Sequence, residues 1–156
     1  MSKIKLLVSS CLLGIDVKYD GGNNKIEGLE KLSDLFNIYP ICPEVEGGMI
    51  VPRLPSEIVS TKPLSVQNQY DIDVTDFFKY GAMQAIDLCK NNDIHIALLK
   101  SNSPSCGNLK VYDGTFSGKL VDGVGITANT LIHNGIKVFN ETQIEELYTY
   151  IKVKEK

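Results

Sequence analysis

Several features that mark common protein classes are missing from this chain of 156 residues. None of its four cysteines forms a Cys-x-x-Cys pair, which argues against a zinc ribbon and against a thioredoxin-like redox motif. Its two histidines, His95 and His133, lack metal-ligand spacing to a cysteine. A site that uses several of these cysteines would combine parts of the chain that are distant in sequence.

An excess of positive charge and a long apolar run are also absent. The 16 lysines and arginines stand against 19 acidic residues, so the net charge is −3, which gives no electrostatic footprint for nucleic acid or for an anionic membrane. No apolar stretch approaches the roughly 20 residues that cross a bilayer, and no signal-peptide pattern begins the chain. We expect a cytoplasmic protein with neither nucleic acid nor membrane as a partner, in a compartment where stable disulfides are rare.

What the chain does contain is an alternation of strand-like and helix-like segments. Its length and its hydrophobic content of 43% suit one domain over residues 1–156. Such an alternation predicts the α/β class: a single-domain, three-layer Rossmann-like sandwich with a mostly parallel sheet and helices on both faces. The expected strands are residues 4–10, 38–42, 94–100 and 138–139, and the expected helices are 25–36, 75–92, 125–135 and 141–152. The proline-rich segment 43–70 is expected to be a long loop.

Three of the four cysteines follow strand-like runs. Cys11 and Cys42 come directly after the first two runs, and Cys106 lies in the loop after the third. Sites in open parallel sheets form beyond the carboxyl ends of the strands, so neighbouring strands would bring these thiols to one edge. Three thiols without a fourth suggest a metal or iron–sulfur centre with an open coordination position. Cys89 lies on the apolar face of a predicted helix, where a cysteine behaves as a small hydrophobic residue.

The segments around these cysteines resemble the 2-thiouracil desulfidase family, and the resemblance runs from residue 6 to about residue 140. Each motif alone is weak, but their occurrence in this order is specific. The motifs are Ser10-Cys11-Leu12-Leu13-Gly14, Tyr19-Asp20-Gly21, Cys42-Pro43-Glu44 with Gly47-Gly48, Pro52-Arg53 with Pro55 and Glu57, Ser103-Pro104-Ser105-Cys106-Gly107, and Gly123-Val124-Gly125-Ile126-Thr127.

The resemblance implies a 4Fe-4S cluster held by three cysteines, which by motif are Cys11, Cys42 and Cys106. It also implies an enzyme that removes sulfur from a small-molecule thiolated pyrimidine base, converting 2-thiouracil to uracil plus hydrosulfide. In this family the iron without a protein ligand is thought to take the sulfur directly, so that it acts as a Lewis acid and no net redox change occurs. The natural substrate, the number of irons and the oligomeric state stay open at this point.

Such a reaction requires proton transfer near the thiols. Glu44 lies two residues after Cys42, and the Cys-Pro-Glu match favours it as the general acid/base. Glu46 is the competing carboxylate, which spacing alone does not exclude. Ser103 and Ser101 lie within a few residues of Cys106, and either hydroxyl is placed to donate to the substrate or to relay a proton, with Ser103 preferred.

Other functions and roles compete with these. Arg53 either orients the substrate or pairs with Glu57, and Lys100 either lies near the cluster or forms a salt bridge at a strand end. A cysteine-nucleophile phosphatase or arsenate reductase would need an arginine six residues after its cysteine, where this chain has Val17. The main alternative is a non-enzymatic iron–sulfur protein, either an electron carrier or a redox sensor, which would release no sulfide from a thiolated base.

Overall fold

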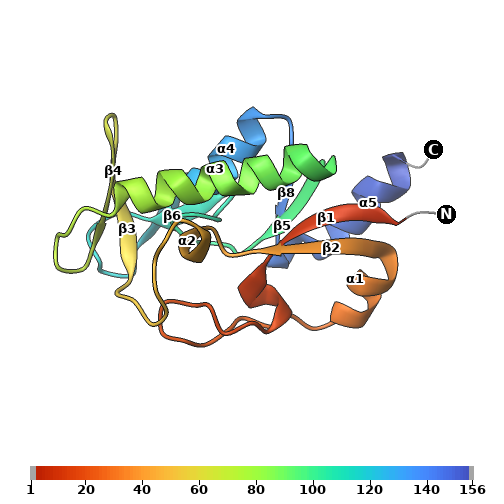
Figure 1. Cartoon of the computed structure of the whole chain (residues 1–156), viewed down its shortest axis with the longest axis horizontal. Helices are drawn as coiled ribbons and strands as arrows, with labels where there is room; N and C mark the ends of the chain where they lie inside the picture. The colour runs from red at the N-terminus through yellow and green to blue at the C-terminus, as the bar shows by residue number, and fades with distance from the viewer. Residues whose placement is uncertain (1–2, 155–156) are drawn as a thin grey trace.

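Four parallel strands form the central sheet of the molecule (Figure 1). The computed structural model describes residues 3–154. The strands are β1 (Ile4–Ser9), β2 (Phe36–Ile41), β5 (Ile96–Leu99) and β8 (Lys137–Asn140), and their order across the sheet is β2-β1-β5-β8. In this register Leu7 of β1 lies opposite both Tyr39 and Ala97. The apolar runs of β1 and β5 are explained by this central position, because both faces of a central parallel strand are covered.

Helices cover both faces of the sheet. One face carries α3 (Thr75–Asn92) and α4 (Ile126–His133), and the other carries α1 (Leu29–Leu35) and α5 (Ile144–Lys154). Successive residues of β1 point to opposite faces: Leu7 packs in the core beneath α3 and α4, whereas Leu6 and Val8 pack in the core beneath α1 and α5. Cys89 is buried in the first of these cores. The predicted three-layer α/β architecture with a parallel sheet is thereby confirmed.

The segment predicted as a long loop contains regular structure, so that prediction was wrong. It holds the short helix α2 (Pro43–Glu46) and an antiparallel hairpin of β3 (Ser56–Thr61) and β4 (Leu64–Asn68). Its prolines lie where they do not interrupt these elements: Pro43 opens α2, a position that proline favours, and Pro63 lies in the turn between the two strands. A second small hairpin pairs β6 (Lys110–Tyr112) with β7 (Leu120–Asp122).

Two glycines let α2 lie directly against α3. A Cβ atom on Gly81 of α3 would collide with the carbonyl oxygen of Pro43, and one on Gly47 would collide with the carbonyl oxygen of Phe77. The backbones therefore approach more closely than any other residue would permit. This contact fixes the position of Cys42 and of the residues that follow it.

Short 3-10 helices follow two of the strands at the carboxyl edge. The helix η1 (Ser10–Leu13) continues from β1, and η2 (Glu141–Gln143) connects β8 to α5. Asn140 closes a capping box with Gln143 at the start of η2. Within residues 3–154 no helix has the length and apolar character needed to cross a membrane.

Candidate functional site

A pocket with a volume of about 560 Å³ opens at the carboxyl edge of the sheet. Its wall is built by the segments that follow β1, β2 and β5, together with Arg53, residues 55–57 and parts of both hairpin regions. The candidate site residues from the sequence all line this one pocket: Cys11, Cys42, Glu44, Ser101, Ser103 and Cys106. The structure thus brings together side chains that are separated by up to 95 positions in the chain.

Each cysteine is positioned at the pocket by a different local structure. Cys11 lies in η1, whose end is marked by Gly14 in a left-handed conformation with φ 87°. Cys42 is the N-cap residue of α2, so its position depends on the close contact of α2 with α3. Cys106 lies in the loop after β5 and is almost completely buried.

The sulfur of Cys106 lies beside two hydroxyl groups. Ser9 Oγ donates to it at 3.4 Å, and Ser105 Oγ, whose proton goes to Glu44, lies 3.6 Å away. Burial nevertheless raises the pKa of Cys106 to about 12, because a thiolate is poorly solvated in the interior. Ser9 also accepts the backbone N–H of Lys100 at 2.9 Å, so one hydroxyl links β1, β5 and this cysteine.

Cys11 and Cys42 are only half-buried and are therefore more accessible. Asn24 Nδ2 donates to Cys11 Sγ at 3.5 Å, and Cys42 Sγ lies 3.9 Å from the carbonyl oxygen of Val17. Burial raises the pKa of both thiols. A hydrogen bond from Asn24 partly opposes this increase for Cys11, and a hydrogen bond from the backbone N–H of Val45 partly opposes it for Cys42. Because a thiol must lose its proton to bind a metal, cluster binding here would release protons.

The donor set at this pocket fits an iron–sulfur cluster. No three histidine, cysteine or acidic side chains within residues 3–154 surround a point suited to one metal ion. A cluster is larger than an ion and spreads its thiolate ligands around itself, and three cysteines on the wall of a single pocket have that kind of arrangement. Soft sulfur donors without a histidine partner favour iron–sulfur chemistry over sites built from oxygen ligands.

Glu44 lies in the pocket wall between a cation and a hydroxyl. Arg53 Nε donates to Glu44 Oε1 at 3.1 Å, and Ser105 Oγ donates to Glu44 Oε2 at 3.0 Å. The competing residue Glu46 is exposed and does not line the pocket. The alternative pairing of Arg53 with Glu57 is wrong, since Glu57 accepts the backbone N–H groups of the loop between β6 and β7 instead.

The Arg53 side chain itself is only 7% exposed and is held by backbone carbonyls as well as by Glu44. Its Nη2 donates to the carbonyl oxygen of Val17 at 3.0 Å, and its Nη1 donates to that of Ile50 at 3.3 Å. With these partners Arg53 fixes the orientation of the Glu44 carboxylate.

Ser103 and Ser105 form a short hydroxyl chain that leads to Glu44. Ser103 Oγ accepts the backbone N–H groups of Ser105 and Cys106, each at 3.1 Å, and lies 2.9 Å from Ser105 Oγ. Because Ser105 gives its proton to Glu44, Ser103 must be the donor in the contact between the two serines. Ser105 was not among the predicted site residues, although its position next to Cys106 was a signal that it would face the site.

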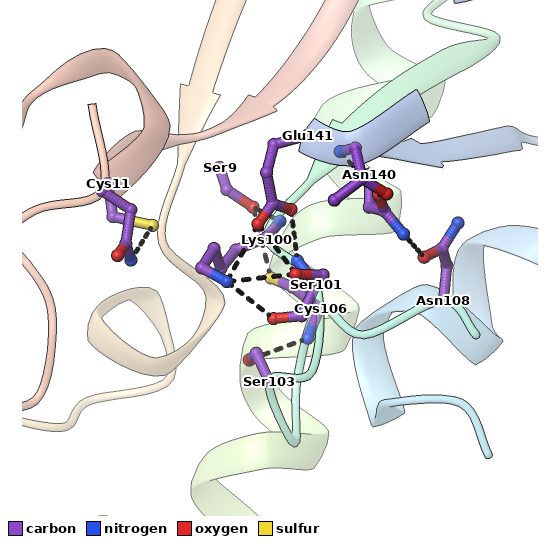
Figure 2. Close-up of polar contacts among 11 residues, drawn as sticks. Ser9, Cys11, Lys100, Ser101, Ser103, Cys106, Asn108, Asn140 and Glu141 are labelled. Atoms are coloured by element: carbon purple, nitrogen blue, oxygen red, sulfur yellow. Dashed lines mark hydrogen bonds and ion pairs between the residues drawn. The ribbon is translucent and has the colours of Figure 1, made fainter. Parts of the chain in front are cut away.

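Ser101 belongs to a different group of side chains. Figure 2 shows Ser101 and Lys100 converging on the carboxylate of Glu141, beside Cys106 and Ser103. Glu141 Oε2 lies 2.7 Å from Ser101 Oγ and 2.9 Å from Lys100 Nζ. Lys100 thus both lines the pocket and forms the predicted strand-end salt bridge. Glu141 was predicted only as the first residue of a helix, so its place in the pocket wall's hydrogen bonds was missed.

Known proteins resemble the chain over most of its length. The 2-thiouracil desulfurase family matches residues 6–143. The chain is 37% identical over 149 residues to YbbK, an uncharacterized protein of Bacillus subtilis (strain 168), with 91% of this chain and 99% of that protein covered. A solved structure of TudS, a 4Fe-4S-dependent thiouracil desulfidase, superposes with a TM-score of 0.90 at 39% identity, covering 97% of this chain and 99% of that one.

The fold and the pocket together define an α/β protein with three cysteine thiols, a carboxylate and hydroxyl groups at the carboxyl edge of a parallel sheet. The chain belongs to the 2-thiouracil desulfurase family, and it is an enzyme of the desulfidase type. The family resemblance noted in the sequence is thereby confirmed.

Proposed function

We propose that this chain, acting as one desulfidase-like domain over residues 1–156, converts 2-thiouracil to uracil and hydrosulfide. The observation that carries the proposal is the single pocket lined by Cys11, Cys42 and Cys106 together with Glu44. The relation to TudS supports it, because that protein is a 4Fe-4S-dependent thiouracil desulfidase with the same fold. A cytoplasmic location belongs to the same proposal, since free thiols persist in reducing compartments.

We assign the three pocket cysteines as the ligands of a 4Fe-4S cluster. Cys89 is excluded from this role because it is buried in the core beneath α3 and α4 and does not line the pocket. When bound, a cluster with three protein ligands supplies one iron without a protein ligand as a soft Lewis acid toward the sulfur of the substrate.

The reaction exchanges the sulfur of a C=S group for the oxygen of a water molecule. The thione and water give the oxo base and hydrogen sulfide, which ionises to hydrosulfide, and no atom changes oxidation state overall. Water must lose its protons during this exchange, so a base is needed near the attacked carbon. We assign that role to Glu44, whose carboxylate lines the pocket and is oriented by Arg53 on one oxygen and Ser105 on the other.

Ser105 and Ser103 extend the proton path from Glu44 along the loop after β5. The donation from Ser103 to Ser105 and from Ser105 to Glu44 runs in one direction, so a proton can move along the chain when the carboxylate changes its charge. We therefore propose Ser103 as a relay group and Ser105 as the link that connects it to Glu44. Ser101 lines the same pocket and contacts the substrate from another side.

Anaerobic reconstitution with iron and sulfide, followed by incubation with 2-thiouracil, tests the proposal. Removal of excess sulfide before the assay lets released sulfide be measured together with the loss of the thione absorbance. Turnover that requires the bound iron is the expected result. A loaded protein that releases no sulfide would overturn the desulfidase assignment in favour of an electron carrier or sensor, and a failure to bind iron would overturn the ligand assignment.

A further inference from the structure

The ammonium group of Lys100 has no proton left for a substrate. Lys100 Nζ donates to the backbone carbonyl of Ser101 at 3.1 Å, to Ser101 Oγ at 3.1 Å and to Glu141 Oε2 at 2.9 Å. A lysine ammonium has three N–H groups and no acceptor, so these contacts use its full capacity. Although Lys100 lines the pocket, it serves there to hold its neighbours.

The hydrogen-bonding direction of the Ser101 hydroxyl follows from these contacts. An ionised carboxylate only accepts and an ammonium only donates, so Ser101 Oγ gives its proton to Glu141 at 2.7 Å and accepts one from Lys100. A hydroxyl oxygen has two lone pairs. One lone pair of Ser101 therefore remains, in a residue that lines the pocket and is half-buried.

Glu141 is placed firmly enough to impose this direction. Its other oxygen, Oε1, accepts the backbone N–H of Ser101 at 2.7 Å. The residue before it, Asn140, is buried and caps η2, and its side-chain amide donates to Asn108 Oδ1 at 2.8 Å. Figure 2 shows this contact between Asn140 and Asn108. Asn108 is also buried and donates to Gln143 Oε1 at 2.9 Å, so a network of side-chain amides fixes the start of η2.

The charge state of Glu141 is consistent with its acceptor role. Burial by itself raises the pKa of this carboxyl, but the hydrogen bonds from Ser101 and Lys100 outweigh burial and hold the pKa below its ordinary value. Glu141 is therefore ionised at neutral pH, where it accepts hydrogen bonds and does not donate them.

We propose that Glu141 and Lys100 lock Ser101 as a hydrogen-bond acceptor, so that the pocket selects thiolated heterocycles carrying a free N–H next to the C=S bond. In this arrangement Ser101 contacts the substrate, and Glu141 is a positioning residue that acts through it. The inference rests on the proposed function and adds to it the class of substrate. A thiolated base whose flanking nitrogens are all substituted offers the remaining lone pair no proton, so the bound complex lacks that hydrogen bond.

The test compares 2-thiouracil, which has an N–H on each side of its C2=S bond, with 1,3-dimethyl-2-thiouracil, which has none. The reconstituted wild-type protein is expected to show kcat/KM lower for the dimethyl compound by about tenfold or more, from the free energy of one hydrogen bond. Calorimetric binding of uracil and 1,3-dimethyluracil provides a readout that does not depend on turnover, and the same preference is expected there.

Variants of the protein show whether the preference comes from the Ser101 acceptor or from steric exclusion of the methyl groups. Ser101→Ala removes the lone pair, and Glu141→Gln removes the ionised partner that orients it. Both are expected to bring the ratio of the two kcat/KM values toward one, with a larger change in KM than in kcat for Glu141→Gln. The matched control is Glu145→Gln, an exposed position on α5, which should keep the wild-type ratio. Thermal unfolding checks each variant for folding.

The outcomes distinguish this inference from the function it rests on. If the wild-type protein desulfurises both compounds equally, or if Ser101→Ala keeps the full preference, the acceptor role is wrong while the desulfidase function stands. A folded Glu141→Gln with an unchanged ratio removes Glu141 as a positioning residue. If the loaded wild-type protein releases sulfide from neither compound, the proposed function fails, and this inference fails with it.

Discussion

The hydroxyl of Ser105 donates to the carboxylate of Glu44 at 3.0 Å, joining two residues that are 61 positions apart in sequence. One lies in the loop after β5 and the other in α2 after β2, so the bond spans the carboxyl edge of the sheet. Ser105 also touches the sulfur of Cys106. The proposed acid/base group and one proposed cluster ligand therefore share a single hydroxyl.

Removing that hydroxyl should impair turnover without removing the cluster. In Ser105→Ala, Glu44 loses one of its two orienting donors, and kcat is expected to fall by about tenfold, in line with the loss of one hydrogen bond. The measurement is steady-state sulfide release at equal iron content per chain. Ser33→Ala, at an exposed position of α1, is the matched control. A kcat equal to that of the wild-type protein would remove Ser105 from the proton path.

The cysteines should divide into three that bind iron and one that does not. We expect Cys11→Ser, Cys42→Ser and Cys106→Ser each to lose most of the iron taken up on reconstitution, because each removes a soft ligand from the pocket. Cys89→Ser should keep its iron but unfold at a lower temperature, since it places a hydroxyl in a buried apolar position at a cost of about 1–3 kcal/mol. Iron content measures the predicted loss or retention of iron, and thermal unfolding measures the predicted loss of stability in Cys89→Ser. Full iron retention in any of the first three would contradict the ligand assignment.

Glu44 and Glu46 should differ sharply in their effect on catalysis. The Glu44→Gln variant preserves the size of the side chain but cannot take up a proton, so turnover is expected to fall by about 100-fold or more, the usual contribution of a general base. Glu46→Gln is the control, because Glu46 is exposed and outside the pocket. Sulfide release at matched iron content is the measurement, and near-wild-type activity of Glu44→Gln would transfer the role to another group.

The ion pair between Glu141 and Lys100 should stabilise the protein in a pH-dependent way. The pKa of Glu141 is lower in the folded protein than its ordinary value. Burial raises this pKa, but the hydrogen bonds from Ser101 and Lys100 lower it by more. A lowered carboxyl pKa contributes stability above the unfolded pKa of about 4.3, and this contribution is lost as the pH falls through the folded pKa. In urea unfolding, the wild-type protein should therefore have a larger free energy of unfolding than Glu141→Gln at neutral pH. This difference should decline below about pH 4. A difference in free energy of unfolding that does not depend on pH would contradict the ionised state of Glu141.

Contact between α2 and α3 should depend on the absence of a side chain at Gly81. The Gly81→Ala variant is expected to lose about 1–3 kcal/mol of stability, because the added methyl collides with the backbone of Pro43 and the helices must separate. Since Cys42 caps α2, iron binding should weaken as well. The control is Gly22→Ala, where a Cβ meets only the flexible side chain of Asp20. Equal unfolding temperatures for wild type and Gly81→Ala would show that the helices tolerate the methyl.

The convergence of the three cysteines could be predicted from sequence because a parallel sheet imposes it. An apolar run ending in a cysteine places that cysteine at the carboxyl edge, and runs that pair in parallel share this edge. The order β2-β1-β5 then makes the three strands direct neighbours. Glu44 followed from the same logic, since it lies one short turn beyond Cys42.

The partners of these residues could not be predicted in the same way. Arg53 is held by the carbonyl of Val17 in the loop after Cys11, by the carbonyl of Ile50 and by Glu44. These contacts follow no periodic pattern in the sequence. The hairpin of β3 and β4 was missed because prolines at 52, 55 and 63 indicate a loop, although they lie outside the paired residues. Glu141 was missed because it meets Ser101 across 40 positions, through pairing of β5 with β8.

The order of the strands also has a mechanical consequence. β2 lies at the end of the sheet with β1 as its single neighbour in the order β2-β1-β5-β8, and Pro40 within it has no amide hydrogen to contribute. Edge strands of this kind open more readily than central ones, as amide hydrogen exchange would reveal. A cluster bound by Cys11, Cys42 and Cys106 would fasten this outer strand to the two central ones. Loss of iron would then make the edge strand β2 open more readily, in addition to ending the desulfuration reaction.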